Sequence, residues 1–183
     1  RIAVVYASGA IEVGKSANDV LFGPTLGSAT LSQQVERAFR RRDIAAVVLR
    51  VESPGGSSLG SGLMRHTIER MKRETKKPLI VSMGSVAASG GYEISCDADR
   101  IYADRYTRTG SIGVLYTRPS FERWYANHGV RQDLFTRGRY MESWSQGRDW
   151  DAAAQAAADS SIRRDYREFV ATVAAARGLP WAA

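Results

Sequence analysis

The sequence has few of the residues on which several common classes of protein depend. Its 183 residues include one cysteine, Cys96, two histidines and four lysines, and no apolar run reaches the roughly 18 to 20 residues that a membrane span needs. One cysteine excludes a disulfide within the chain, and we expect Cys96 to be a small core residue. Because no cluster of His, Cys, Asp and Glu has metal-ligand spacing, and no phosphate-binding glycine loop is present, we expect neither a metal nor a cofactor.

The charge balance is strongly basic, with a formal charge of +7 and a pI near 9.9. Such a charge is compatible with nucleic-acid binding. The basic residues are mostly scattered arginines, however, and the one compact run, residues 40–42, lies at the end of a predicted helix, where the helix dipole favours cations. We therefore expect no nucleic-acid partner.

Short apolar runs alternate with helical patterns along the whole chain. We predict strands over residues 2–6, 44–51, 79–83, 100–103, 112–116 and 130–136. Helices are predicted over residues 31–42, 59–73, 87–96, 119–127 and 151–176. This alternation predicts an α/β fold with a mostly parallel sheet, and a 44% hydrophobic composition is enough for one domain over residues 1–183.

The segment 84–92, GSVAASGGY, follows a predicted strand and presents a single central hydroxyl, Ser89. Its small residues allow a sharp turn into a helix, and backbone N–H groups at that point stabilise negative charge. Ser89 is therefore the candidate nucleophile. A tight glycine turn with a capping serine would give the same letters.

A second glycine segment, SPGG at residues 53–56, also follows a predicted strand and precedes a helical pattern. An acyl-transfer enzyme needs two N–H donors that bind the oxyanion of its tetrahedral intermediate, and loss of one donor typically costs about 3 to 4 kcal/mol. The natural pair is the N–H of Gly56 and the N–H of Gly90, the residue after the candidate nucleophile.

These two segments, together with TGSIGV at residues 109–114, resemble the three signature segments of the signal peptide peptidase A family, membrane-anchored serine proteases of bacteria. The resemblance extends over nearly the whole chain. It implies a Clp protease/crotonase-like spiral of β-β-α units, with Ser89 as nucleophile and Gly56 and Gly90 as oxyanion donors. It also implies a lysine, rather than a histidine, as general base.

The expected lysine is missing from its position. In short members of that family the base lies about fifty residues after the serine, and the matching segment here, residues 137–142, places Met141 on it. A methionine cannot accept a proton. Of the lysines present, Lys72, Lys76 and Lys77 close a predicted helix at the end opposite the serine turn, which leaves Lys15 as the least unsuitable.

Long family members solve this problem with two tandem copies of the fold, the lysine in the first copy and the serine in the second. On that interpretation this chain is the C-terminal catalytic half of a longer protein, and another repeat or subunit supplies the base. An engineered substitution at Met141 would explain the same letter. A Ser-His-Asp triad using His66 or His128 is disfavoured, because neither histidine is placed near Ser89 by the sequence pattern.

The resemblance implies an endopeptidase that degrades remnant signal peptides and other unfolded or membrane-derived polypeptides. It further implies an oligomer or packing against an N-terminal repeat. The anchor would lie outside this chain, and the catalytic domain would face the periplasm or cell exterior. Two alternatives stay open: a crotonase-like acyl-thioester enzyme, and an inactive assembly module, which Met141 would suit.

Overall fold

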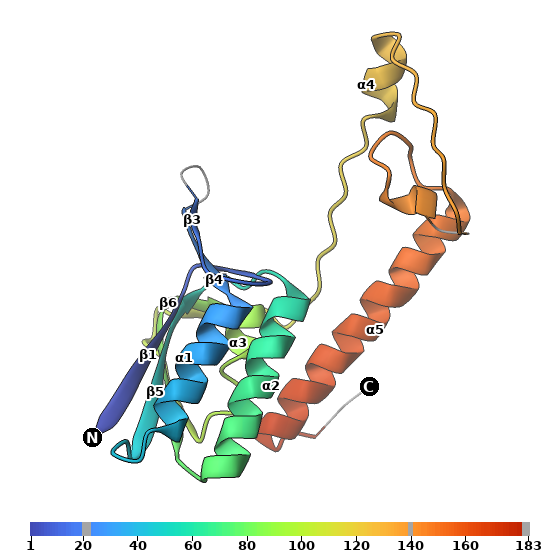
Figure 1. Cartoon of the computed structure of the whole chain (residues 1–183). Helices are drawn as coiled ribbons and strands as arrows, with labels where there is room; N and C mark the ends of the chain where they lie inside the picture. Colours follow the sequence, from blue (N-terminus) through green and yellow to red (C-terminus); the bar gives the residue numbers. More distant parts are fainter. Residues whose placement is uncertain (20–22, 139–140, 181–183) are drawn as a thin grey trace. The chain divides into compact units, whose positions relative to one another are not determined.

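The computed structural model describes residues 1–19, 23–138 and 141–180 (Figure 1). The chain forms two compact units. The first comprises Arg1–Gly113 and Phe169–Ala183, and the second comprises Val114–Glu168. The two glycine segments of the candidate site and Ser89 all belong to the first unit, whereas Met141 belongs to the second.

The first unit is built on a five-stranded sheet with the order β1-β5-β6-β7, in which β8 also pairs with β6. Its strands are β1 (Ile2–Ser8), β5 (Ala46–Ser53), β6 (Leu79–Ala88), β7 (Arg100–Tyr102) and β8 (Arg108–Gly110). Every pairing is parallel. This arrangement confirms the predicted α/β class with a mostly parallel sheet.

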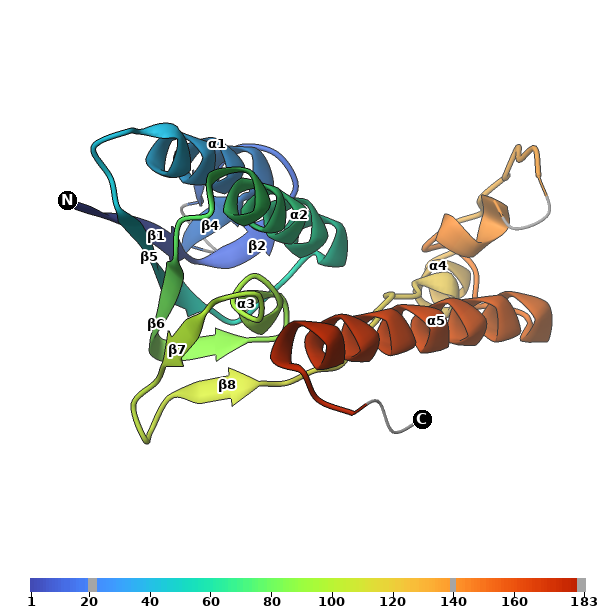
Figure 2. The same cartoon turned by 90° about the horizontal axis from the view of Figure 1, so that it is seen from below.

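Helices α1 (Ser28–Arg40) and α2 (Ser58–Thr75) run side by side against one face of this sheet (Figure 2). The sequence of β5 shows why: Val47, Leu49 and Val51 alternate with more exposed positions and are fully buried. Because successive side chains of a strand point to opposite faces, these three residues all face the helices. The core they form also contains Phe39, Leu31, Met64, Ile68 and Met71.

A second, smaller sheet with the order β2-β4-β3 was not predicted from the sequence. It consists of β2 (Ala10–Glu12), β3 (Asn18–Asp19) and β4 (Gly23–Gly27), which are too short to produce a clear periodicity. Its importance lies in Ile11, which makes an isolated parallel bridge to Gly56. The small sheet thereby supports the SPGG segment.

The second unit contains α4 (Glu122–Asn127), the 3-10 turn η1 (Met141–Trp144) and the first part of α5 (Ala152–Arg177). Asp151 begins α5 by accepting a hydrogen bond from the Ala154 N–H at 2.7 Å. The last part of α5 belongs to the first unit, where Arg177 donates to the Ala98 carbonyl at 3.0 Å. Over the described ranges, no helix combines the length and apolar character needed to cross a membrane.

Three of the predicted elements are wrong. Within residues 111–138 the structure has no strand, so neither 112–116 nor 130–136 is one. The chain leaves the sheet at Gly110 and Ser111, both of which have positive φ. In this part of the chain the strand that pairs with β6 is β8, which ends at Gly110. The predicted helix 87–96 shrinks to α3 (Gly90–Glu93), because Ala87 and Ala88 stay in β6 to pair with β8.

Candidate active site

Ser89 occupies a sharp turn between β6 and α3, with φ 52° and ψ −123°. A residue with a Cβ rarely adopts positive φ, so the surroundings must hold it there. The Ser89 N–H donates to the Gly110 carbonyl at 2.9 Å, and the Ser89 carbonyl accepts from the N–H groups of Tyr92 and Glu93. The strand-turn-helix context predicted for Ser89 is therefore correct, although α3 is only one turn long and its dipole is correspondingly small.

The SPGG segment lies directly against this turn. A Cβ built on Gly55 would stand 2.7 Å from the Ser89 Cβ and 2.9 Å from the Ala88 carbonyl oxygen, and Gly55 itself has φ +97°. Only glycine permits this approach. The structure thus brings together the two glycine segments that the sequence analysis paired.

The hydrogen bonds of the SPGG segment determine which way its amides point. The Ile11 N–H donates to the Gly55 carbonyl at 2.8 Å, and the Ser57 N–H donates to the Ile11 carbonyl at 2.9 Å. Since neighbouring residues of an extended chain direct their amides to opposite sides, the Gly56 N–H points away from Ile11. It has no hydrogen-bond partner within the described residues, and the same holds for the Gly90 N–H at the start of α3.

Two residues that the sequence analysis did not select fix this geometry. The Ser53 hydroxyl, fully buried, donates to the Gly9 carbonyl at 2.7 Å and accepts from the Gly55 N–H at 3.2 Å. The Glu52 carboxylate accepts from the N–H groups of Ser85 at 2.7 Å and Val86 at 3.2 Å. These bonds form where the register between β5 and β6 shifts. The Glu52 side chain therefore replaces the backbone hydrogen bonds that the two strands cannot make at this point.

The third signature segment closes the other side of the turn. Ala88 pairs with Gly110 in the sheet, and the Thr109 hydroxyl donates to the Ala87 carbonyl at 2.8 Å. Behind α3, the Ser95 hydroxyl donates to the Gly91 carbonyl at 2.7 Å. All three segments of the family resemblance therefore meet at Ser89.

The lysines of the first unit are engaged elsewhere or exposed. Lys72 donates to the Asp97 carbonyl and to Asp99 Oδ1 at 2.9 Å, and the Lys77 ammonium binds the carbonyls of Phe39 and Arg41 at the end of α1. Lys76 is the left-handed C-cap of α2. Of the three lysines expected at the end of this helix, Lys76 caps it, whereas Lys72 and Lys77 are held by other elements. Lys15 lies exposed after β2.

Neither histidine bonds to Ser89 in the part of the chain that the structure describes. His66 lies exposed on α2. His128 belongs to the second unit, where its Nδ1 lies 2.8 Å from the Trp124 carbonyl oxygen and its ring stacks on Trp124. These contacts give no support to a Ser-His-Asp triad, the alternative that the sequence pattern disfavoured.

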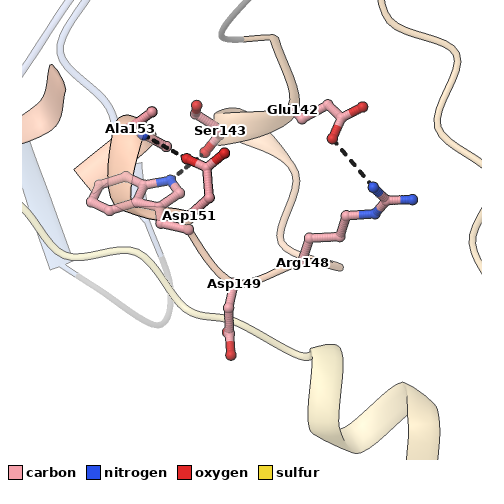
Figure 3. Close-up of a pocket in the computed structure, with 8 residues that line it drawn as sticks. Glu142, Ser143, Arg148, Asp149, Asp151 and Ala153 are labelled. Atoms are coloured by element: carbon pink, nitrogen blue, oxygen red, sulfur yellow. Dashed lines mark hydrogen bonds and ion pairs between the residues drawn. The ribbon is translucent and has the colours of Figure 1, made fainter. Parts of the chain in front are cut away.

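Met141 opens η1 in the second unit, with about half of its surface exposed. Residues 139 and 140 of the segment matched to the lysine region lie outside the described residues. The second unit also has a cavity of about 440 Å³, lined by Glu142, Arg148 and Trp150 among others but not by Met141 (Figure 3). Arg148 pairs with Glu142 at 3.3 Å, and the Trp150 indole donates to the Ser143 carbonyl at 2.9 Å.

Charged groups beneath α3 have structural partners. Arg65 and Asp97 form a partly buried ion pair at 2.8 Å, in which burial raises the pKa of the Asp97 carboxyl against the opposing effect of Arg65. Burial, together with the charge of Asp97, raises the pKa of the Cys96 thiol to about 11. Cys96 is fully buried, as predicted. Among the described residues no group of three or more His, Cys, Asp and Glu side chains is placed to hold a metal ion.

Comparison with known proteins identifies the family. The model of peptidase family S49 matches residues 71–183. Protease 4 of Haemophilus influenzae is 42% identical over 133 residues, which cover 73% of this chain and 21% of that protein. The chloroplastic serine protease SPPA of Arabidopsis thaliana is 38% identical over 148 residues, covering 78% of this chain and 20% of the relative.

Protease 4 of Salmonella typhi is 35% identical over 176 residues, which cover 96% of this chain and 27% of that protein. The chain thus spans less than a third of each of these relatives. The family match covers the serine turn, the TGSIGV segment and α5, and the match to the Salmonella protein covers nearly the whole chain. On this evidence the chain belongs to peptidase family S49.

Proposed function

We propose that this chain carries the nucleophile and the oxyanion hole of a serine endopeptidase, with Ser89 as nucleophile and the N–H groups of Gly56 and Gly90 as donors. One observation carries the proposal: Gly55 packs closely against Ser89 and the Gly90 nitrogen, and the N–H groups of Gly56 and Gly90 have no hydrogen-bond partner within the described residues. Membership of a peptidase family supports it.

In the reaction, the Ser89 Oγ forms a bond to the carbonyl carbon of the scissile peptide, and its proton passes to the general base. The carbonyl oxygen becomes an oxyanion that the two N–H groups bind. The C–N bond then breaks, the base returns the proton to the leaving amine, and an acyl-enzyme is left. Water hydrolyses the acyl-enzyme by the same steps.

The base is a lysine that another repeat or another copy of the chain supplies. The lysines of the first unit support this assignment, because Lys72 and Lys77 are held by hydrogen bonds to groups other than Ser89, and Lys76 caps a helix. A lysine acts as a base only if burial lowers its pKa toward 7 or 8. Such burial requires a surface packed over Ser89, which a second repeat would provide.

The substrates are remnant signal peptides and other unfolded or membrane-derived polypeptides, bound extended beside the Gly55–Gly56 segment. The Gly56 N–H points away from Ile11, on the side where a substrate strand would add to the segment. An anchor outside this chain would hold the enzyme at the membrane, with the catalytic domain in the periplasm or at the cell exterior. Homo-oligomers, or pairs of repeats, would complete the site.

A serine-directed phosphonate tests the proposal in the full-length protein. We expect mass spectrometry to find the label on Ser89, and Ser89→Ala to abolish both labelling and peptide hydrolysis without loss of thermal stability. Ser85→Ala, which removes an exposed hydroxyl from β6, the strand that ends just before Ser89, is the matched control and should leave both unchanged.

A Ser89→Ala variant that still hydrolyses peptides would refute the assignment. If acyl-thioester turnover persists in that variant, the site is of the crotonase type, which needs the two N–H donors but not the serine. If the full-length wild-type protein is not labelled by the phosphonate and does not hydrolyse peptides, the chain is an inactive module.

A further inference from the structure

Ser53 is a fully buried polar residue beside the site, and the mechanism above makes no use of it. Its side chain is fully buried, and its hydroxyl is saturated by two backbone groups, the Gly9 carbonyl and the Gly55 N–H. Ser53 also packs against α3, because a Cβ on Gly91 would stand 2.6 Å from the Ser53 carbonyl oxygen. Ser53 thus links Gly9, just after β1, and Gly55 of its own segment to the helix that follows Ser89.

We propose that Ser53 is the positioning residue of the oxyanion hole, and that its hydroxyl sets the direction of the Gly56 N–H. This inference rests on the proposed function. The hydroxyl fixes the Gly55 N–H on one side, and Ile11 fixes the Gly55 carbonyl at 2.8 Å. With both ends of residue 55 held, the next amide, that of Gly56, has a single orientation.

The requirement is for a hydroxyl and not simply for a small residue. The two groups that meet the side chain are one acceptor and one donor, and a serine hydroxyl is a small group that satisfies both at once. Alanine would leave the buried N–H of Gly55 unpaired, and the segment would turn to find another partner. A shift of about 1 Å at a reacting group can cost roughly 100-fold in rate.

The test compares Ser53→Ala with Ser28→Ala in the full-length protein. Ser28 is also buried, and its hydroxyl also accepts from a glycine N–H, that of Gly14, but it does not touch the SPGG segment. We expect Ser53→Ala to lower kcat by roughly 10- to 100-fold with KM changed by no more than about twofold. The Ser28→Ala variant should lose about as much stability as the Ser53→Ala variant, but its kcat should equal that of the unmodified protein.

A peptidyl boronic acid gives a readout that a purely structural role would not change. It forms a tetrahedral adduct whose oxygen occupies the oxyanion hole, so its affinity should fall by the same factor as kcat. The affinity for an uncleaved product peptide should be unaffected, and the pH profile should keep its midpoint because the base is untouched.

Three results would overturn the inference: a kcat within twofold of wild type in a folded Ser53→Ala protein, a loss confined to KM, or an equal loss in Ser28→Ala. If Ser53→Ala does not fold, Ser53→Cys keeps a weak donor and acceptor of nearly the same size and should show a smaller loss of the same kind.

If neither variant folds, hydrogen exchange in the unmodified protein decides. We expect the Gly55 amide to be protected with β5, whereas exchange at the rate of an open loop would show that Ser53 does not hold it. The proposed function is judged separately. An inert Ser89→Ala beside a fully active Ser53→Ala would remove only the role of Ser53, whereas an active Ser89→Ala would remove the catalytic site itself.

Discussion

At the residue scale, three backbone positions at the site have conformations that side chains disfavour: Gly55 at φ 97°, Gly56 at φ 149° and Ser89 at φ 52°. Two of them are glycines, and the third is the serine itself, which therefore stores strain. The sequence analysis selected the Gly56 and Gly90 N–H groups as donors, but it could not show what holds the Gly56 amide in its orientation. That depends on Ile11, whose strand is too short to predict.

Gly55→Ala tests this close approach. The new Cβ would meet the Ser89 Cβ at 2.7 Å and the Gly90 nitrogen at 2.9 Å, so we expect at least about 2 kcal/mol of lost stability and a loss of most activity. Gly62→Ala, within α2, is the control, because the new Cβ would meet nothing within 4 Å. Alanine favours a helix over glycine, so this change should raise the free energy of unfolding by about 0.5 to 1 kcal/mol. Denaturant unfolding measures both, and an unharmed Gly55→Ala would show that the contact is loose.

The buried Cys96 thiol should make the free energy of unfolding depend on pH in the alkaline range. Burial raises the pKa of the Cys96 thiol from its ordinary value of 9.0 to about 11, so the thiol loses its proton first in the unfolded chain. Between those pH values the unfolded state binds fewer protons, so the free energy of unfolding should fall as pH rises from about 9 to about 11, and be unaffected by this group below pH 9.

The comparison is with Cys96→Ala, unfolded in denaturant at pH 8, 9, 10 and 10.5. Lysines and tyrosines titrate in both proteins, so only the difference in slope reports the thiol. Parallel curves for the two proteins would show that burial does not perturb Cys96.

At the scale of elements, β6 determines where Ser89 is placed. It pairs with β5 up to Met83, shifts register, and resumes at Ala87, with the Glu52 carboxylate bridging the gap. Apolar periodicity predicted β1, β5, β6 and both covering helices, because each buries one regular face. It could not predict the register shift or β8, since those depend on a charged side chain and on pairing between distant segments.

Glu52→Ala should therefore do more than remove a charge. It leaves the N–H groups of Ser85 and Val86 without acceptors, so we expect a loss of about 2 to 4 kcal/mol in the free energy of unfolding and a lower kcat. Glu12→Ala, an exposed acid on β2, should change stability by less than about 0.5 kcal/mol. Equal effects from the two changes, measured by urea unfolding, would rule out a bridging role.

At the scale of the whole molecule, the proposed nucleophile and both proposed donors lie in one compact unit and Met141 in the other. The serine turn and the SPGG segment could be predicted from the sequence because both are local motifs. The base could not, because the proposed shared site would depend on packing that no local pattern encodes.

We expect the 183-residue chain alone to hydrolyse peptides very slowly, because a serine without a base keeps only the oxyanion hole and binding. Met141→Lys should restore part of the activity, with a rate that rises with pH as the new lysine deprotonates. Initial rates on an apolar peptide ester between pH 6 and 10 measure this. Ordinary rates in the unmodified chain would mean that the base is internal, and Lys15 and His66 would then be replaced in turn.

The contacts of Ser89 also bear on how the site forms during folding. The pairings Ile2↔Ala46 and Val47↔Leu79 each close a long loop, and the Ser89 N–H is held by Gly110. Such non-local contacts form slowly, and a strained turn cannot form ahead of the sheet that holds it. In a ribosome-bound chain the Ser89 turn therefore stays unformed until residue 110 has emerged, and the proposed catalytic site can form only when this unit has folded.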